Sequence, residues 1–121
     1  MQEYCLGRAE TSVIDVYDVL YSSSIDVQSF IELWDKLATE LNYPTPELMS
    51  LEDRLLDLIA INNYRHWFDL SGLDMFDDEY EILEQFNVKY SDIAIENKIE
   101  LSTIEDILNF IVAIRQLLLT D

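Results

Sequence analysis

Residues 102–118 read STIEDILNFIVAIRQLL, and this stretch decides the fold class. Its apolar residues recur at spacings of three and four, as one face of an α-helix requires. They are Ile104, Ile107, Leu108, Ile111, Ile114 and Leu118. Ser102 and Glu105 form a capping box, in which each side chain accepts a hydrogen bond from the other residue's backbone N–H. Because apolar residues occur on nearly every side of this helix, we expect it to lie at the centre of the core.

Two earlier segments carry the same spacing. Residues 13–21 place apolar groups on one helical face with Ser12 as N-cap. Their valines are β-branched, so a β-strand remains an alternative interpretation of this segment. Residues 27–41 form a clearer helix, which Ser24 or Asp26 caps. The inward-facing residues of this second helix are Val27, Phe30, Trp34, Leu37 and Leu41.

The middle of the chain is less regular. A third helix has Thr45 as its N-cap and runs over about residues 46–64, with a proline at its first position. Residues 65–76 lack a clean period, so we expect a structured, aromatic-rich loop there. A fourth helix follows over residues 77–86, with acids in its first turn. Residues 87–101 are ambiguous between an extended segment and a short helix.

Composition supports one domain over residues 1–121, with a flexible N-terminus over residues 1–11. Half of the 121 residues are hydrophobic, which excludes a disordered tail. The two glycines and two prolines are too few for the tight turns of an all-β fold. The sequence therefore predicts an all-α antiparallel bundle of about five helices.

Charge and targeting signals narrow the partners. The chain has 25 Asp and Glu against seven Lys and Arg, a net charge of −18. Such a surface repels phosphate backbones and anionic lipids, so we expect no direct nucleic-acid binding and no membrane binding. No apolar run suits a signal peptide or a membrane span, so we expect a cytoplasmic protein. The single cysteine, Cys5, cannot form an internal disulfide.

Motifs for catalysis or cofactor binding do not occur in this sequence. It has no nucleophile elbow, no P-loop and no dinucleotide-binding glycine motif. His66 is the only histidine and reads as a partly buried side chain at the end of the third helix. A calcium-binding loop that starts at Asp69 fails, because Gly72 and Tyr80 fall where the loop needs other residues. We expect no enzyme activity, no metal and no cofactor.

The stretch between Trp67 and Val88 is the strongest candidate for a binding surface. It contains seven acids and no Lys or Arg, with aromatic residues interleaved. One interpretation is a solvated helix face beside core aromatics. The other is an interface in which carboxylates meet a partner's Lys and Arg while an aromatic side chain anchors the centre. The residues predicted to bind a partner are Trp67, Asp69, Asp74, Phe76, Asp77, Asp78, Glu79, Tyr80, Glu81 and Glu84.

Two stretches together resemble the colicin D-type immunity proteins and their relatives in contact-dependent growth inhibition. Residues 19–30 read VLYSSSIDVQSF, which is similar to that family's apolar helix end, small-residue turn and polar N-cap. Residues 55–64 read LLDLIAINNY, which is similar to its leucine-rich helix that closes on an aromatic before an acidic segment. The resemblance implies an all-α protein that binds and neutralises a cognate bacterial nuclease toxin, such as a tRNase. It also implies that the acidic face stands in for the phosphates of the tRNA.

The chain departs from that family in two respects. The Pro-Asp step that often follows the aromatic is absent, and residues 1–12 and 102–119 are additional. Contact residues are therefore not carried over from the family.

A rival resemblance is to the acyl carrier proteins, which are also small, acidic and helical. It rests on residues 72–74, GLD, on residues 83–86, LEQF, and on residues 103–111, TIEDILNFI. The serine that carries the phosphopantetheine arm in that family directly precedes a leucine. Here Gly72 holds that position and Ser71 lies one residue out of register. The alternative function is therefore a carrier-like or nucleic-acid-mimicking small acidic binding domain.

Overall fold

The structure is a computed structural model that describes residues 1–61, 81–82, 84–85 and 102–117. Its elements are α1 (Val13–Val16), the π-helix η1 (Tyr17–Tyr21), α2 (Val27–Glu40), the 3₁₀-helix η2 (Pro46–Leu48), α3 (Leu55–Ile61) and α7 (Ile104–Gln116). Residues 81–82 and 84–85 are also helical. The described residues contain no β-strand, only an isolated antiparallel bridge between Arg54 and Thr103. The all-α class is confirmed for this part of the chain, and the bundle of about five helices stays a prediction.

α1 runs directly into η1, so the first expected helix is confirmed and the strand alternative is wrong. The Asp15 N–H donates to the Ser12 hydroxyl oxygen (3.4 Å), as expected for an N-cap. Tyr21 is buried, and Tyr17 donates its hydroxyl to the carbonyl oxygen of Ile25 (2.7 Å). These contacts shape the turn that leads into α2.

α2 carries the expected apolar seam with one correction. Asp26 caps it by accepting a hydrogen bond from the Ser29 N–H (3.0 Å). Val27, which we expect to point inward, is 42% exposed, because it is the first residue of α2 and the buried residues of the helix begin at Phe30. The buried residues of the helix are Phe30, Leu33, Trp34, Leu37 and Ala38.

α2 ends in a Schellman motif. The Tyr43 N–H donates to the Ala38 carbonyl oxygen (3.0 Å), and the Asn42 N–H donates to that of Thr39 (3.1 Å). Asn42 has a φ of 65°, in the left-handed region that asparagine adopts more readily than most residues. The chain therefore reverses here, where the sequence predicts the end of the helix.

The third expected helix is interrupted, which corrects the prediction for residues 46–64. η2 ends at Leu48, and Met49 is extended, with φ −70° and ψ 136°. The Ser50 N–H donates to the Asp53 carboxylate (3.1 Å), which holds a turn instead of a helix. The backbone of Asp53 and Leu55 bonds to the segment before α7 rather than along a helix. Helical structure therefore resumes only at α3.

α7 begins one residue later than the sequence predicts, which corrects the expected capping box. The box joins Thr103 and Asp106, not Ser102 and Glu105. The bridge to Arg54 keeps Thr103 extended, with φ −132° and ψ 172°, so it serves as the N-cap. The start of α7 is therefore set by pairing with Arg54, a residue far away in the sequence, and not by the local pattern alone.

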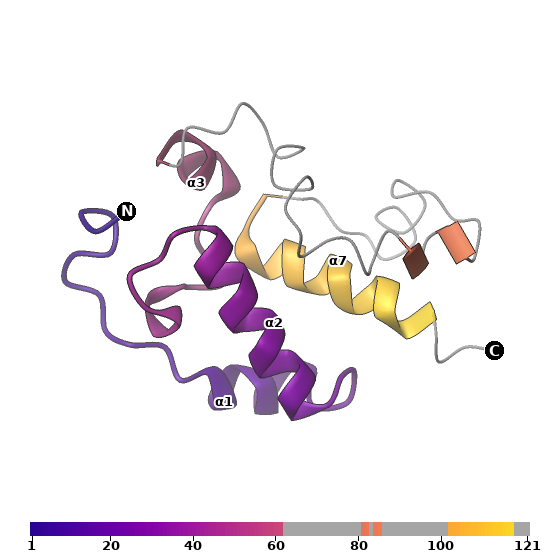
Figure 1. Ribbon diagram of the computed structural model, residues 1–121. Coiled ribbons are helices and arrows are strands. Elements are labelled where there is room, and N and C mark those ends of the chain that lie inside the picture. The colour runs from indigo at the N-terminus through magenta and orange to yellow at the C-terminus, as the bar shows by residue number, and fades with distance from the viewer. Residues whose placement is uncertain (62–80, 83, 86–101, 118–121) are drawn as a thin grey trace.

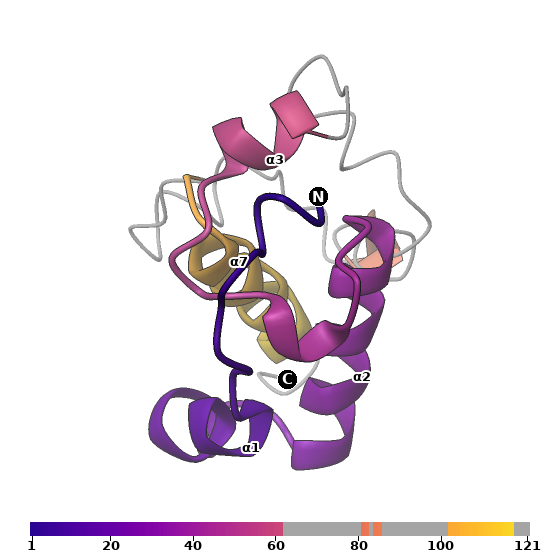
Figure 2. The same ribbon diagram turned by 90° about the vertical axis from the view of Figure 1, so that its left-hand side faces the viewer.

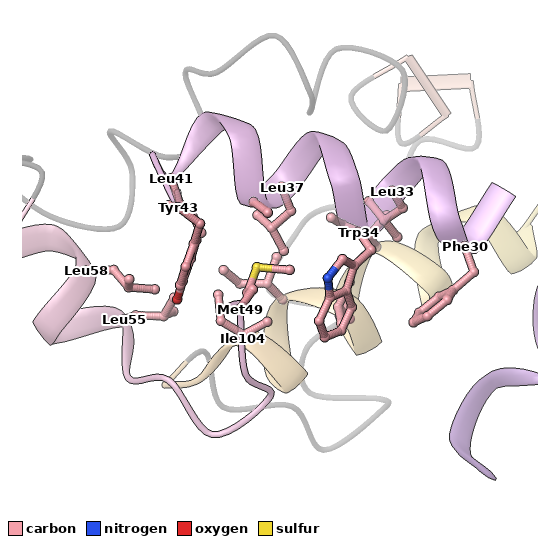
Figure 3. Packing of buried hydrophobic residues seen from close by; sticks show 14 of the residues in the cluster. Phe30, Leu33, Trp34, Leu37, Leu41, Tyr43, Met49, Leu55, Leu58 and Ile104 are labelled. Atoms are coloured by element: carbon pink, nitrogen blue, oxygen red, sulfur yellow. The ribbon is translucent and has the colours of Figure 1, made fainter. Parts of the chain in front are cut away.

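The core lies between α2, α3 and α7. Figure 3 shows the apolar seam of α2 facing Met49 and Ile104, with Leu55 and Leu58 of α3 closing one end. α7 contributes the largest set of buried residues among these elements, as expected of a central helix. They are Ile104, Ile107, Leu108, Phe110, Ile111, Val112 and Ile114. Burial of each such large side chain stabilises the fold by about 1.5–3 kcal/mol.

The first eleven residues, which we expected to be flexible, lie against the rest of the domain. Cys5 is buried, and Met1 and Tyr4 pack against the core cluster. Figure 2 shows this segment running from the level of α3 down to α1. Its position follows from the ion pair of Arg8 with Asp53, a partner 45 residues away that pattern reasoning does not connect to it.

The expectations for residues 65–76 and 87–101 and for most of the helix over 77–86 lie outside the described residues.

Candidate functional site

The acidic surface expected over residues 67–84 is described at two of its members. Glu81 and Glu84 are helical residues with exposed side chains. Both carboxylates therefore face water, as binding to a partner requires. The other predicted residues lie outside the described part of the chain, and their role stays a prediction. They are Trp67, Asp69, Asp74, Phe76, Asp77, Asp78, Glu79 and Tyr80.

A second acidic stretch, which we did not single out from the sequence, covers residues 9–35. It contains six acids and no Lys or Arg. Its acids are all exposed, and they are Glu10, Asp15, Asp18, Asp26, Glu32 and Asp35. The signal that could have found it is the one used for residues 67–88, a long run of chain without a basic residue. Both stretches are runs of negative charge without a basic residue of their own.

Exposed apolar side chains lie among the acids of α1 and η1. Val19 is 79% exposed, and Ile14 and Leu20 are each nearly half exposed. Asp15 and Asp18 belong to the same two elements and also face water. We call these five residues the α1–η1 surface. Apolar side chains left in water next to carboxylates suit a protein partner that offers both apolar and basic groups.

The α1–η1 surface lies at one end of the molecule, beside the first turn of α2 (Figures 1 and 2). Asp26 and Val27 of that first turn are exposed as well. A π-helical turn such as η1 is rare and is often found at functional sites. This end of the molecule therefore combines exposed carboxylates, exposed apolar groups and an irregular helix.

Asp53, unlike the exposed acids above, has a buried carboxylate. Asp53 is 3% exposed and is the one buried charged side chain among the described residues. Arg8 donates from Nη1 to Oδ2 (2.8 Å) and from Nη2 to Oδ1 (2.6 Å), a two-pronged ion pair. Tyr43, the Ser50 N–H (3.1 Å) and the Tyr4 hydroxyl (3.4 Å) also donate to the carboxylate. We call these five residues the Asp53 cluster.

Hydrogen bonding keeps Asp53 ionised. Burial raises the pKa of Asp53, but the hydrogen bonds from Arg8, Tyr43 and the Ser50 N–H outweigh it and lower the net pKa below the ordinary value. The same hydrogen bond raises the pKa of Arg8, so the pair is charged at neutral pH. A carboxylate with a lowered pKa and both oxygens engaged is a poor general base. The cluster is therefore suited to holding the fold, not to moving protons.

Four members of the Asp53 cluster, all but Tyr43, line an open cleft of about 460 Å³. One wall comes from the N-terminal segment and the other from the chain between η2 and α3. Its lining residues are Tyr4, Arg8, Ala9, Thr11, Leu48, Ser50, Glu52, Asp53, Arg54 and Asp57. Arg8 crosses from one wall to the other, so the ion pair joins the two walls.

Within residues 1–61, 81–82, 84–85 and 102–117, no three His, Cys, Asp or Glu side chains converge as ligands for a metal ion. In that part of the chain, no helix has the length and apolarity to cross a bilayer.

Comparisons with protein-family models, curated proteins and solved structures found no significant match to this chain.

Proposed function

We propose that this protein binds and neutralises a basic nuclease toxin domain, as an immunity protein does, in a stoichiometric complex and without catalysis of its own. The observation that carries the proposal is the exposed acidic stretch over residues 9–35, where six carboxylates face water and the stretch itself contains no Lys or Arg. Glu81 and Glu84 are further exposed acids.

The chemistry of a nuclease explains why such a surface suits it. A nuclease holds the phosphates of its substrate with Lys, Arg and other donors, so its active site is a basic patch. Carboxylates on a folded protein complement that patch and exclude the substrate. Opposite charge also speeds the encounter of the two proteins, which matters for an inhibitor that must act before the toxin does.

The α1–η1 surface adds exposed apolar side chains to the negative charge. Steering by surface charge raises the association rate, but tight complexes also need an apolar centre from which water is excluded. Val19, Ile14 and Leu20 are apolar, exposed and flanked by Asp15 and Asp18. A toxin with an apolar side chain ringed by Lys and Arg would fit this arrangement.

The first test is the gene that lies beside the one for this chain. The proposal expects a large toxin with a basic C-terminal domain. Genes for fatty-acid or polyketide synthesis in that place would contradict it and favour the carrier-like alternative.

The second test uses the nuclease domain from that neighbouring gene. We expect a one-to-one complex in light scattering and loss of nuclease activity in proportion to the amount of protein added. Inhibition by far less than one equivalent would contradict a stoichiometric inhibitor. No complex at physiological salt would contradict binding itself.

A further inference from the structure

The N-terminal segment, residues 1–8, is attached to the domain almost entirely through side chains. Its backbone hydrogen bonds are local, for example from the Cys5 N–H to the Met1 carbonyl oxygen (3.1 Å). Among the described residues, the first backbone bond from the N-terminus to the rest of the domain is from the Thr11 N–H to the Glu47 carbonyl oxygen (2.7 Å). A segment held in this way can leave without breaking a helix.

The ion pair with Asp53 is the main attachment of that segment. The Arg8 side chain is 25% exposed, and its Nη1 also donates to the Leu48 carbonyl oxygen (3.1 Å). Its guanidinium carbon lies 4.6 Å from the centre of the Tyr4 ring. The charge of Arg8 therefore also stabilises the position of Tyr4 in the same segment. Cys5, which is buried, is a second anchor, and Met1 and Tyr4 also pack against the core cluster.

Asp53 does not depend on Arg8 alone for its hydrogen bonds. Tyr43 and the Ser50 N–H, which belong to the body of the domain, still donate to the carboxylate when Arg8 is absent. Departure of the segment therefore leaves a partly satisfied carboxylate in an opened cleft instead of an isolated buried charge.

We propose that residues 1–8 form a strap that detaches as one unit while the helices remain folded, with the ion pair between Arg8 and Asp53 as its latch. Detachment removes one wall of the 460 Å³ cleft and brings Cys5 into water. Local opening of this kind is expected for a short segment whose described backbone hydrogen bonds are all local. Gln2, Glu3 and Leu6 of the strap are exposed even when it is closed.

Cys5 reports on the strap, because it is the one cysteine of the chain. The rate at which a maleimide labels Cys5 in the full-length protein measures how often the strap opens. We expect this rate to depend only weakly on urea, because release of eight residues exposes little surface. Labelling with the full urea dependence of global unfolding, measured by circular dichroism, would overturn the proposal.

Removal of the latch provides a second, independent test. We expect Arg8→Met to speed the labelling of Cys5 about tenfold or more, since hydrogen bonds to charged groups are among the stronger ones. The effect on the thiol itself has the opposite sign. Burial raises the pKa of Cys5 and Arg8 lowers it, so loss of Arg8 makes the thiol less ionised and less reactive. Faster labelling in this variant therefore reports exposure.

Two further variants give the controls. Arg54→Met removes an exposed arginine from the same cleft and should leave the labelling rate within about twofold of the wild type. Arg8→Lys keeps the charge but loses the two-pronged geometry, so its rate should fall between those of the wild type and Arg8→Met. Equal rates for Arg8→Met and Arg54→Met would overturn the latch.

Discussion

The Asp53 cluster and the α1–η1 surface both contain aspartates, but the aspartate is buried in the first and exposed in the second. Asp53 is buried, accepts hydrogen bonds from Arg8, Tyr43 and the Ser50 N–H, and has a lowered pKa. Asp15 and Asp18 face water.

This difference separates carboxylates that build the fold from those that can serve a partner. Burial of a charge that has no partner lowers the free energy of unfolding by roughly several kcal/mol. A buried carboxylate is therefore found only where hydrogen bonds or an ion pair compensate it. Exposed like charges weaken the fold through mutual repulsion, which is modest in water and screened by salt. In a chain of net charge −18, the second group is the one whose presence calls for a functional explanation.

The largest expected effect is at Asp53. We expect Asp53→Ala to lower the free energy of unfolding by about 3–5 kcal/mol, because it leaves Arg8, Tyr43 and the Ser50 N–H without their acceptor. Urea denaturation followed by circular dichroism measures the loss. Glu52→Ala removes an exposed carboxylate from the same cleft and should change stability by less than about 0.5 kcal/mol. Equal losses in the two variants would mean that burial does not distinguish the two kinds of acid.

The pH dependence of stability also distinguishes the buried Asp53 from the exposed acids. The pKa of Asp53 is lower in the folded state than its ordinary value of 3.8, so its contribution is complete well above pH 3.8. The contribution is lost as the pH falls through the folded-state pKa. We therefore expect the stability difference between the wild type and Asp53→Asn to be constant near neutral pH and to shrink in acid below pH 3.8. A difference that shrinks already between pH 7 and pH 5 would contradict an ionised, hydrogen-bonded Asp53.

Charge reversal on the α1–η1 surface should separate binding from folding. We expect Asp15→Lys with Asp18→Lys to weaken toxin binding by about 2–5 kcal/mol if either carboxylate is buried against the partner. The isolated protein should be as stable as the wild type or slightly more so, because the exchange relieves repulsion. Titration calorimetry at physiological salt measures the binding.

The surface predicted from the sequence provides the matched comparison. Asp77→Lys with Asp78→Lys tests residues 67–84, and Glu96→Lys with Glu100→Lys is the control, for which we expect the mildest effect. Wild-type affinity in the Asp15/Asp18 variant together with loss of binding in the Asp77/Asp78 variant would move the interface to residues 67–84. Wild-type affinity in both would remove both stretches from the interface.

A third kind of carboxylate, Asp106, lies between the two groups. It is half-buried and accepts hydrogen bonds from the N–H groups of Ser102 (2.9 Å) and Thr103 (3.0 Å). We expect Asp106→Ala to cost about 1 kcal/mol in unfolding experiments, as loss of a helix cap does. Glu105→Ala should cost less than about 0.5 kcal/mol, since the structure gives it no part in the box. The reverse order would restore the box of Ser102 and Glu105.

The sequence was a good guide to α1, α2 and α7 because their signals are local. Spacing of three and four, an N-cap and a following Asn or Pro act within one or two turns of helix. They predicted Ser12 as an N-cap correctly, included Asp26 as one of two candidate caps, and predicted that α2 ends at about residues 42–44. At the start of α7 the predicted cap was one residue too early, and the bridge to Arg54 accounts for the shift from Ser102 to Thr103.

For the candidate binding surfaces too, the sequence predicts some features and only the structure shows others. The sequence shows where charge is unbalanced along the chain, and the structure adds which of those acids face water and which apolar groups lie among them. Leu20 belongs to the apolar face that the spacing of residues 13–21 predicts, yet it is nearly half exposed, and spacing alone does not show this. Residues 67–80, predicted as the main surface, lie outside the described part of the chain.

By itself, the sequence determined the helical class, the apolar seams of α2 and α7 and the excess of negative charge, because each depends on composition or on neighbours a few positions apart. Tertiary structure alone decided the break between η2 and α3, the start of α7 and the packing of the N-terminal segment. All three depend on residues 49–55, where Asp53 meets Arg8 from 45 positions away and the backbone pairs with the segment before α7. Contacts between residues so far apart leave no periodic trace in a sequence, since their free energy comes from burial and hydrogen bonding that only the folded chain brings together.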